Sequence, residues 1–310
     1  MSWFLERVYM NAIRDAPVIS DTQLAKLPVI VFSHGLAGNQ TMYSQLMGNL
    51  ASRGFVVLCV EHRDGSACGS GRGNYSETIP HIRNPHPEGP AAVSFRCEQL
   101  SQRVQEVKEA FQLLVALNEG KPMRNLLGSE FPLLQGRLDL AHTVIMGHSY
   151  GGATTLSVLQ QHDNPFSCGI SMDPWMYPIR DFSGISTPML SIQCERFHWR
   201  KNLDDILKIW NKAASSPLNQ FAVVKDTKHN DVSDFILVLP RLMGKFLQSG
   251  ERDLESVYDL YDRVIISYLQ QLWRLDDESL LKVDVESLKG CGDVSFGDEA
   301  FKLLVSNMER

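Results

Sequence analysis

The sequence has few cysteines, and their spacing does not suggest a metal site or a disulfide framework. The chain of 310 residues contains six, widely separated and without a C-x-x-C pair. Zinc ribbons and small disulfide scaffolds need closely spaced cysteines, so both are disfavoured and we expect reduced thiols. The six are Cys59, Cys68, Cys97, Cys168, Cys194 and Cys291.

Long apolar runs and clusters of basic residues are also missing. No uninterrupted apolar run approaches the roughly 18 residues of a membrane-spanning helix. Glu6 interrupts the apolar stretch that a signal peptide would need near the N-terminus. We therefore expect no transmembrane segment and a cytoplasmic protein. The net charge of −6 and the lack of a Lys/Arg cluster disfavour nucleic acid as a partner.

What the sequence does contain is an alternation of short apolar runs with longer helical patterns. Most of the runs have apolar residues at consecutive positions, as strands buried on both faces do. This alternation predicts an α/β fold with a mostly parallel central sheet flanked by helices. We expect strands at 28–33, 55–60, 143–146, 168–172, 188–193 and 220–224, and helices at 41–53, 95–117, from about 152, and at 254–273.

The length allows two domains, but α/β folds of this size often form one. The helical pattern near the C-terminus, 254–275, has an apolar face, which predicts that it packs on the body of the protein. We therefore expect a single domain over residues 1–310. The segment 64–90 is crowded with Gly, Pro, Ser and Asn and has no usable period, which predicts a flexible surface loop or a substrate-facing lid.

A G-x-S-x-G motif directly follows the apolar run at 143–146. A serine hydroxyl needs a neighbouring base to attack, and a sharp strand-to-helix turn exposes it to one. Glycines two positions before and after the serine allow the close chain approach of such a turn. The context therefore predicts an α/β-hydrolase nucleophile elbow with Ser149 as the nucleophile. The motif consists of Gly147, His148, Ser149, Tyr150 and Gly151.

Acyl transfer by a serine also needs N–H donors aimed at the oxyanion. One is usually the N–H of the residue after the nucleophile, here Tyr150, and the other comes from a loop after an earlier strand. The segment HGLAG at 34–38 follows the first predicted strand. We expect the main-chain N–H groups of Leu36 and Tyr150 to form the oxyanion hole.

The acid and the base should follow the serine along the chain, as in α/β-hydrolases. Two histidines lie well beyond the elbow helix. His229 follows the run 220–224, where a late loop would return it over the serine, whereas His198 is flanked by aromatic residues, which suggests packing. We therefore predict His229 as the base. For the acid, Asp173 and Glu195 each follow a predicted strand, and spacing alone leaves them equal.

Five longer segments carry a family resemblance. They are HGLAGNQTMYSQLMGNLASRGFVVLCVEHRDGSA at 34–67, FRCEQLSQRVQEV at 95–107, GHSYGGATTLSVL at 147–159, CGISMDPWMYP at 168–178 and KHNDVSDF at 228–235. Together they resemble the platelet-activating factor acetylhydrolases, both the plasma enzyme (lipoprotein-associated phospholipase A2) and the type II intracellular enzyme. The similarity runs through about residues 3–275, and the EHRD and DPWMYP strings are typical of that family.

The resemblance implies a calcium-independent serine esterase, a 1-alkyl-2-acetylglycerophosphocholine esterase. Such an enzyme removes the short sn-2 acyl group of platelet-activating factor or of oxidatively truncated phospholipids. The resemblance makes Ser149 the nucleophile and His229 the base, and the DPWMYP string makes Asp173 the acid. It also matches Leu36 and Tyr150 to the oxyanion donors, and it implies no metal and no cofactor. Candidate liners of the acyl pocket are Trp175, Met176, Phe197 and Trp199.

The chain departs from the family in three places. It has fewer residues before the HGLAG segment than family members usually have, it has no glycine at position 2 for myristoylation, and its 64–90 segment is unlike theirs. A phospholipid substrate implies contact with a membrane or a lipoprotein surface, so a peripheral membrane location is also expected. The segment 1–14 mixes apolar and basic residues, as an interfacial helix or a packed edge element would. The oligomeric state is left open.

Two other functions fit the same motifs. A general short-chain carboxylesterase or lipase would share the fold and the triad but prefer other esters. A hydrolase-fold protein that serves only as a binding module would commonly have lost a member of the triad. Ser149, Asp173 and His229 are all present in this chain.

Overall fold

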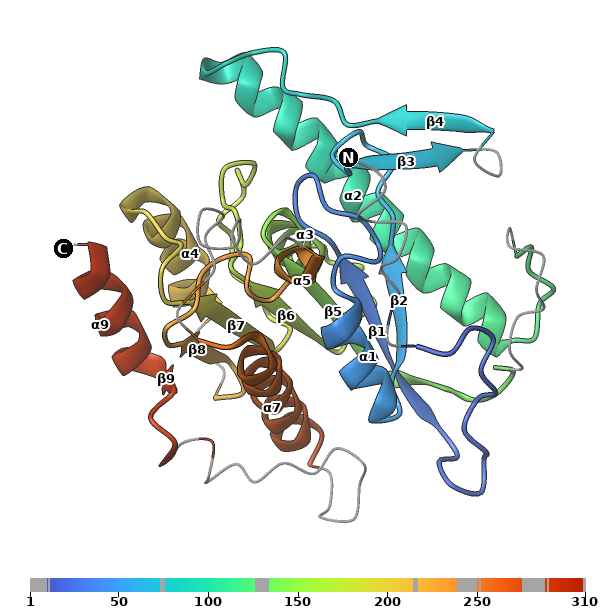
Figure 1. Cartoon of the computed structure of the whole chain (residues 1–310). Coiled ribbons are helices and arrows are strands. Elements are labelled where there is room, and N and C mark those ends of the chain that lie inside the picture. Colours follow the sequence, from blue (N-terminus) through green and yellow to red (C-terminus); the bar gives the residue numbers. More distant parts are fainter. Residues whose placement is uncertain are drawn as a thin grey trace.

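Seven strands lie side by side in one central sheet, in the order β2-β1-β5-β6-β7-β8-β9 (Figure 1). The computed structural model describes residues 10, 12–72, 76–125, 134–213, 217–238, 250, 252–274, 288 and 290–308. Neighbouring strands are parallel, except that β9 is antiparallel to β8. The strands are β1 (Leu27–Ser33), β2 (Val56–Val60), β5 (Leu138–His148), β6 (Cys168–Met172), β7 (Met189–Cys194), β8 (Gln220–Val224) and β9 (Val294–Phe296).

Helices cover both faces of this sheet (Figure 1). Successive side chains of a strand point to opposite faces. In β1, Ile30 and Phe32 pack on the side of α1 and α7, whereas Val29 and Val31 pack on the side of α2, α3, α4 and α9. Both faces of the strand are therefore core, which explains its consecutive apolar residues. The helices are α1 (Ser44–Ser52), α2 (Gly89–Asn118), α3 (Tyr150–Leu159), α4 (Arg200–Ala213), α5 (Phe235–Val238), α7 (Leu254–Trp273) and α9 (Gly297–Met308).

This architecture confirms the predicted mostly parallel sheet flanked by helices. All six predicted strands are present, and the third is longer than expected because β5 begins at Leu138 and ends at His148. The helix predicted at 254–273 has the same bounds as α7, and Arg274 ends it in a left-handed conformation. Its buried side chains join the core on the α1 side of the sheet. Residue 275, the last of the predicted C-terminal helix segment, lies outside the described residues.

The segment 64–90 contains more regular structure than its composition predicted. Strands β3 (Gly69–Arg72) and β4 (Glu77–Pro80) pair antiparallel as a separate hairpin, and α2 begins at Gly89 within the segment. The composition of the segment therefore gave no sign of this hairpin or of the start of α2. The two strands of the hairpin consist mostly of small or polar residues and lack the alternation of apolar and polar residues that indicates a strand. A separate two-stranded hairpin does not need that alternation, because it has no apolar face to bury. A role as a lid stays a prediction, and residues 73–75 lie outside the described part of the chain.

The helices α4 and α9 and the short edge strand β9 were not predicted from the sequence. The N-terminal segment 1–14 is described only at residue 10 and at 12–14, so the expected interfacial or edge helix lies outside the described residues. No helix of the described chain is long and apolar enough to cross a membrane.

The parallel sheet brings the candidate site residues to one edge. Parallel strands all end at the same side of a sheet, and ligands bind outside those carboxyl ends. The HGLAG loop at 34–38 follows β1, Ser149 follows β5, and Asp173 follows β6. His229 follows β8. Residues up to 195 positions apart in the sequence are thereby placed in one neighbourhood.

Candidate active site

Ser149 lies in the sharp turn between β5 and α3. Its φ of 59° is in the left-handed region, which is costly for a non-glycine residue and typical of functional sites. A Cβ atom on Gly151 would lie 1.9 Å from the carbonyl oxygen of Ser33, and one on Gly147 would lie 2.3 Å from the carbonyl oxygen of Gly151. Both predicted elbow glycines are therefore needed because backbone segments approach closely there.

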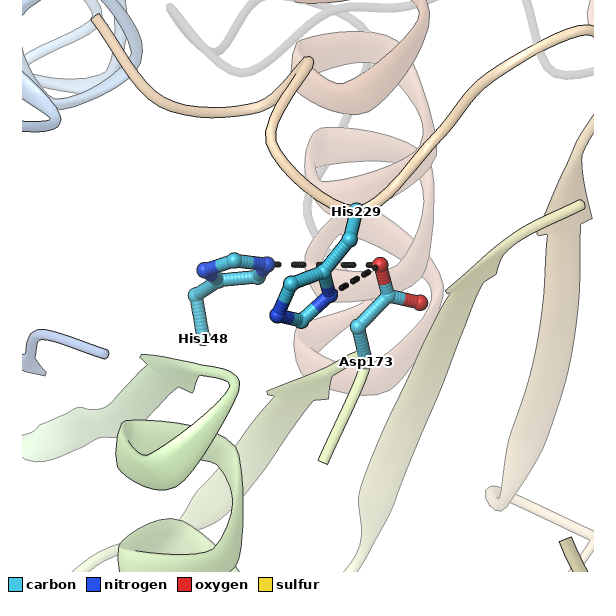
Figure 2. A group of neighbouring side chains, drawn as sticks. All are labelled: His148, Asp173 and His229. Atoms are coloured by element: carbon cyan, nitrogen blue, oxygen red, sulfur yellow. Dashed lines mark hydrogen bonds and ion pairs between the residues drawn. The ribbon is translucent and has the colours of Figure 1, made fainter. Parts of the chain in front are cut away.

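The Asp173 carboxylate faces the His229 imidazole (Figure 2). His229 Nδ1 lies 3.3 Å from Asp173 Oδ2, and the Cys194 N–H donates to Oδ1 at 2.7 Å. Burial alone would raise the pKa of Asp173, but the imidazoles of His198 and His229 beside it lower that pKa well below its ordinary value. The ionised carboxylate favours the His229 tautomer with its proton on Nδ1, which leaves Nε2 free to act as a base.

His198, which the sequence analysis assigned to packing, is buried against the other oxygen of Asp173. Its Nε2 lies 3.6 Å from Oδ1. The Nδ2 group of Asn202 donates to the Pro174 carbonyl and also lies 3.1 Å from His198 Nδ1. Because Nδ2 can only donate, Nδ1 must accept, and the His198 proton lies on Nε2, towards the carboxylate. Asp173 therefore lies between two imidazoles, a feature that the flanking aromatic residues gave no reason to expect.

His148, inside the elbow motif, lies beside His229 and Asp173 (Figure 2). Its ring centroid is 4.4 Å from that of His229, and its Nε2 is 4.0 Å from Asp173 Oδ2. Burial, and then the charge of His229, lower the pKa of His148 to about 3, so the ring is neutral near pH 7. Its Nδ1 lies 2.8 Å from the hydroxyl of Tyr43.

His148, Asp173 and His229 are also the one group, within the described residues, whose ligand atoms lie close enough to share a metal ion. Those atoms lie within 4.8 Å of one another. Two of them already face each other across the His229–Asp173 contact. A metal ion there would displace the shared proton, so the arrangement suits proton transfer by His229 better than metal binding.

Glu195, the alternative acid, is directed elsewhere. Its Oε2 accepts the N–H of Asp226 at 2.6 Å, and its Oε1 accepts from the Asn307 side chain at 3.1 Å. Glu195 therefore joins the loop after β8 to α9. Of the two acids that spacing left equal, the one that contacts His229 is Asp173.

The HGLAG loop lies against the elbow. A Cβ atom on Gly35 would lie 3.2 Å from the Ser149 Cβ. Tyr150 is the first residue of α3, so its N–H has no acceptor within the helix. No group in the described part of the chain accepts a hydrogen bond from the Leu36 N–H. Both N–H groups near the elbow are thus available to donate, as an oxyanion hole requires, and their role in one stays a prediction.

The four candidate pocket residues occupy different positions. Phe197 stacks on His229 with ring centroids 3.6 Å apart, and Trp199, 44% exposed, packs edge-on against Phe197. Trp175 packs edge-on against Tyr150. Met176 is only 1% exposed and lies in the core on the α3 side. Phe197 contacts the triad candidate His229 through its ring, and the Trp175 main-chain N–H donates to the Ser149 carbonyl at 2.9 Å. The pocket role of all four stays a prediction.

Comparison with known proteins agrees with the resemblance found in the sequence. A family model described as platelet-activating factor acetylhydrolase, isoform II, matches residues 2–288. The platelet-activating factor acetylhydrolase of Cavia porcellus is 33% identical over 279 residues, which are 85% of this chain and 62% of that protein. The corresponding protein of Canis lupus familiaris is 32% identical over 258 residues, 79% of this chain and 57% of that protein. The chain thus spans about three fifths of these relatives.

A solved structure supports the fold. A ferulic acid esterase from Streptomyces cinnamoneus superposes with a TM-score of 0.62, covering 87% of this chain and 74% of its own. At 16% sequence identity, this likeness concerns the α/β-hydrolase fold alone. The family model, in contrast, covers nearly the whole chain, including the elbow and the loops that carry Asp173 and His229. The chain therefore belongs to the platelet-activating factor acetylhydrolase family.

Proposed function

We propose that the protein is a serine esterase that hydrolyses the short sn-2 acyl ester of platelet-activating factor-like phospholipids. The products are a lysophospholipid and a short carboxylate, such as acetate. The observation that carries this proposal is the family match over residues 2–288, combined with the Asp173–His229 contact at the sheet edge where Ser149 lies. Calcium plays no part, since serine, imidazole and carboxylate supply the nucleophile, the base and the orienting charge.

The reaction follows from the roles of these groups. His229 Nε2 takes the proton of Ser149 as the serine oxygen attacks the ester carbonyl carbon, while Asp173 stabilises the resulting imidazolium. The N–H groups of Leu36 and Tyr150 stabilise the oxyanion. His229 then returns the proton to the departing lysophospholipid hydroxyl. A water molecule, activated by His229, hydrolyses the acyl-Ser149 ester and releases the carboxylate.

Preference for a short acyl group is assigned to the aromatic residues around the base. Phe197 covers one face of His229, and Trp199 packs on Phe197 towards solvent. A bulky wall at this place limits the length of the acyl chain, and each excluded methylene changes the transition-state free energy by about 1–3 kcal/mol. Trp175 and Met176 complete the proposed wall.

The cellular setting belongs to the same proposal. The substrate is taken from a membrane or lipoprotein surface by a cytoplasmic, peripherally binding protein. The 310 residues act as a single domain, because one sheet carries both the elbow and the triad loops. The hairpin β3–β4 in segment 64–90 is the proposed lid. The loop after β4 ties it to the loop after β2, because the Ile82 N–H donates to the Gly65 carbonyl at 2.8 Å.

The first test compares two choline phospholipids with the same sn-1 chain, one with an sn-2 acetyl group and one with an sn-2 palmitoyl group. We expect kcat/KM for the acetyl ester to be higher by at least about 100-fold, the result of only a few excluded methylenes. Ser149→Ala should lower kcat on the order of 10⁴-fold or more. Ser157→Ala, in the same helix α3, is the matched control and should keep full activity, and a calcium chelator should have no effect.

Each other outcome has a distinct meaning. Equal turnover of both esters would replace the proposal by a general short-chain carboxylesterase or lipase. If a fluorophosphonate labels neither the wild type nor Ser149→Ala, the protein is a non-catalytic binding module. Labelling that persists in Ser149→Ala would show that another nucleophile reacts.

A further inference from the structure

The loop between β1 and α1 carries three successive peptide groups that decide where the Leu36 N–H points. If the Gly35–Leu36 peptide group rotated by half a turn, its carbonyl oxygen would replace its N–H and repel an oxyanion. A preformed oxyanion hole therefore needs partners that hold these peptide groups. Each of the three has such a partner in the structure.

The first peptide group joins His34 to Gly35 and is held at both edges. Arg103 Nη1 donates to the His34 carbonyl oxygen at 2.6 Å. The Gly35 N–H donates to the Tyr43 hydroxyl oxygen at 3.2 Å. The carbonyl and the N–H of a trans peptide group point in opposite directions. Arg103 from α2 and Tyr43 before α1 therefore fix its rotation from opposite sides.

The second peptide group joins Gly35 to Leu36 and is held by its carbonyl. This oxygen accepts from the Gly38 N–H at 3.1 Å and from His34 Nδ1 at 2.7 Å. A carbonyl can only accept, so the His34 proton lies on Nδ1. Because the carbonyl is directed towards Gly38 and His34, the Leu36 N–H points the other way and keeps no acceptor among the described residues.

The third peptide group joins Leu36 to Ala37 and is tied to the loop after β2. The Ala37 N–H donates to the Ser66 carbonyl at 2.7 Å. The Ser66 hydroxyl in turn accepts from Arg103 Nη2 at 2.6 Å and from Nε at 2.9 Å. Arg103 therefore holds the oxyanion loop directly at His34 and indirectly through Ser66.

Arg103 also contacts the other half of the candidate oxyanion hole. Its guanidinium carbon lies 4.3 Å from the ring centroid of Tyr150, whose N–H is the second donor. The side chain is fully buried, and Asp64, the aspartate of the EHRD string, neutralises it at 3.2 Å. A buried, neutralised guanidinium with five directional donors is suited to fixing several acceptors at once.

Tyr43 connects the oxyanion loop to the elbow. Burial raises the pKa of Tyr43 far above its ordinary value, so the phenol keeps its proton. The hydroxyl oxygen accepts from Gly35, and its proton is available for the neutral His148 ring, whose Nδ1 lies 2.8 Å away. One hydroxyl thus connects the residue before Leu36 with the residue before Ser149.

We propose that Arg103 and Tyr43 are positioning residues that hold the Gly35–Leu36 peptide group with its N–H towards Ser149 before the substrate binds. This proposal rests on the proposed function, because it assumes that Ser149 is the nucleophile. It adds that the oxyanion hole is preformed and names the side chains that keep it so. The EHRD string and the helix segment at 95–107 act together in this role, through Asp64 and Arg103.

The test uses two variants. Tyr43→Phe removes the hydroxyl that contacts both Gly35 and His148, and Arg103→Lys keeps the positive charge beside Asp64 but loses the guanidinium group that donates to both His34 and Ser66. The measured quantity is the rate constant of phosphonylation of Ser149 by a fluorophosphonate. This reagent places an oxygen in the oxyanion hole, so it tests the hole independently of the natural ester substrate. We expect this rate constant and kcat to fall about 10- to 100-fold, somewhat less than the loss on removing an oxyanion donor itself. KM and the pH dependence of the rate should stay close to those of the wild type, because the His229–Asp173 pair is untouched.

The matched controls are Tyr268→Phe, a buried tyrosine of α7 whose hydroxyl has no hydrogen-bond partner among the described residues, and Arg53→Lys, which pairs with Asp262. Both should label at the wild-type rate. The final extent of labelling counts the folded molecules, so a residue that acts only on stability would lower the extent and leave the rate constant unchanged. That result for both variants would overturn the positioning role. If the wild type is labelled normally but does not hydrolyse platelet-activating factor analogues, only the proposed substrate is wrong. If the wild type is not labelled at all, both the proposed function and the positioning role are wrong.

Discussion

At the scale of single residues, the environment of Asp173 separates it from Glu195. Asp173 is buried and faces His229, whereas Glu195 contacts Asp226 and Asn307. We expect Asp173→Asn to lower kcat on the order of 10⁴-fold, because an amide cannot hold the reactive tautomer or stabilise an imidazolium. Glu195→Gln should remain within about threefold of the wild type, because the Glu195 contacts hold the loop after β8 to α9 rather than orient His229. The glutamine oxygen still accepts the Asp226 N–H, and the Asn307 amide can turn so that its oxygen accepts from the new NH2 group. Steady-state kinetics of the two variants decides the assignment, and the reverse order of activities would contradict it.

Part of this site could be predicted because its sequence motifs require a particular local backbone geometry. The glycines around Ser149 are needed where backbones almost touch, so their spacing identifies the turn. The acid could not be derived from spacing, because Asp173 and Glu195 end neighbouring strands and only the side-chain direction distinguishes them. His198 and Tyr43 were missed for a similar reason: their partners, Asp173 and Gly35, are brought to them by loops whose paths depend on the whole fold.

At the scale of elements, the junction of β1, β5 and α3 tolerates no side chain at Gly151. A Cβ atom there would lie 1.9 Å from a carbonyl oxygen of β1, a backbone atom that cannot move without separating α3 from the sheet. We expect Gly151→Ala to destabilise the protein by about 3 kcal/mol or more and to abolish activity. Gly48→Ala in α1, where a Cβ meets no atom within 4 Å, should instead be about 0.5–1 kcal/mol more stable. Urea unfolding of both variants tests this, and similar stabilities would refute the close packing.

The elements themselves were predictable to different degrees. Strands buried on both faces, such as β1 and β6, have continuous apolar runs that indicate them without knowledge of the fold. The helix α4 buries Leu203, Ile206 and Ile209 at helical spacing, so the sequence contains a pattern that indicates this helix. The edge strand β9 has only three residues and forms because β8 offers a free edge. No local pattern of three residues can indicate such a strand.

At the scale of the whole molecule, the buried imidazoles make stability depend on pH. Burial lowers the pKa of His34 against the raising effect of the neighbouring Glu61 carboxylate, and burial and then the charge of Arg103 lower the pKa of His62. Burial, and then the charge of His229, lower the pKa of His148 to about 3. In the unfolded chain each imidazole would take up a proton near its ordinary pKa of 6.5. The unfolded state therefore binds more protons than the folded state just below pH 6.5, and the free energy of unfolding falls as the pH is lowered.

We expect the free energy of unfolding to decrease between pH 7.5 and pH 5.5, by up to about 1 kcal/mol per pH unit for each of the three histidines once the pH is below 6.5. Burial raises the pKa values of Glu106, Asp231 and Asp262, which offsets part of this loss at the acid end of the range. Urea unfolding at several pH values measures the slope. His62→Gln should reduce the slope by the share of one histidine, whereas His86→Gln, on the surface, should leave it unchanged. A stability that stays constant or rises over this range would mean that the buried imidazoles are already charged in the folded protein. The neutral His148 that accepts the Tyr43 hydroxyl proton would then have to be reassigned.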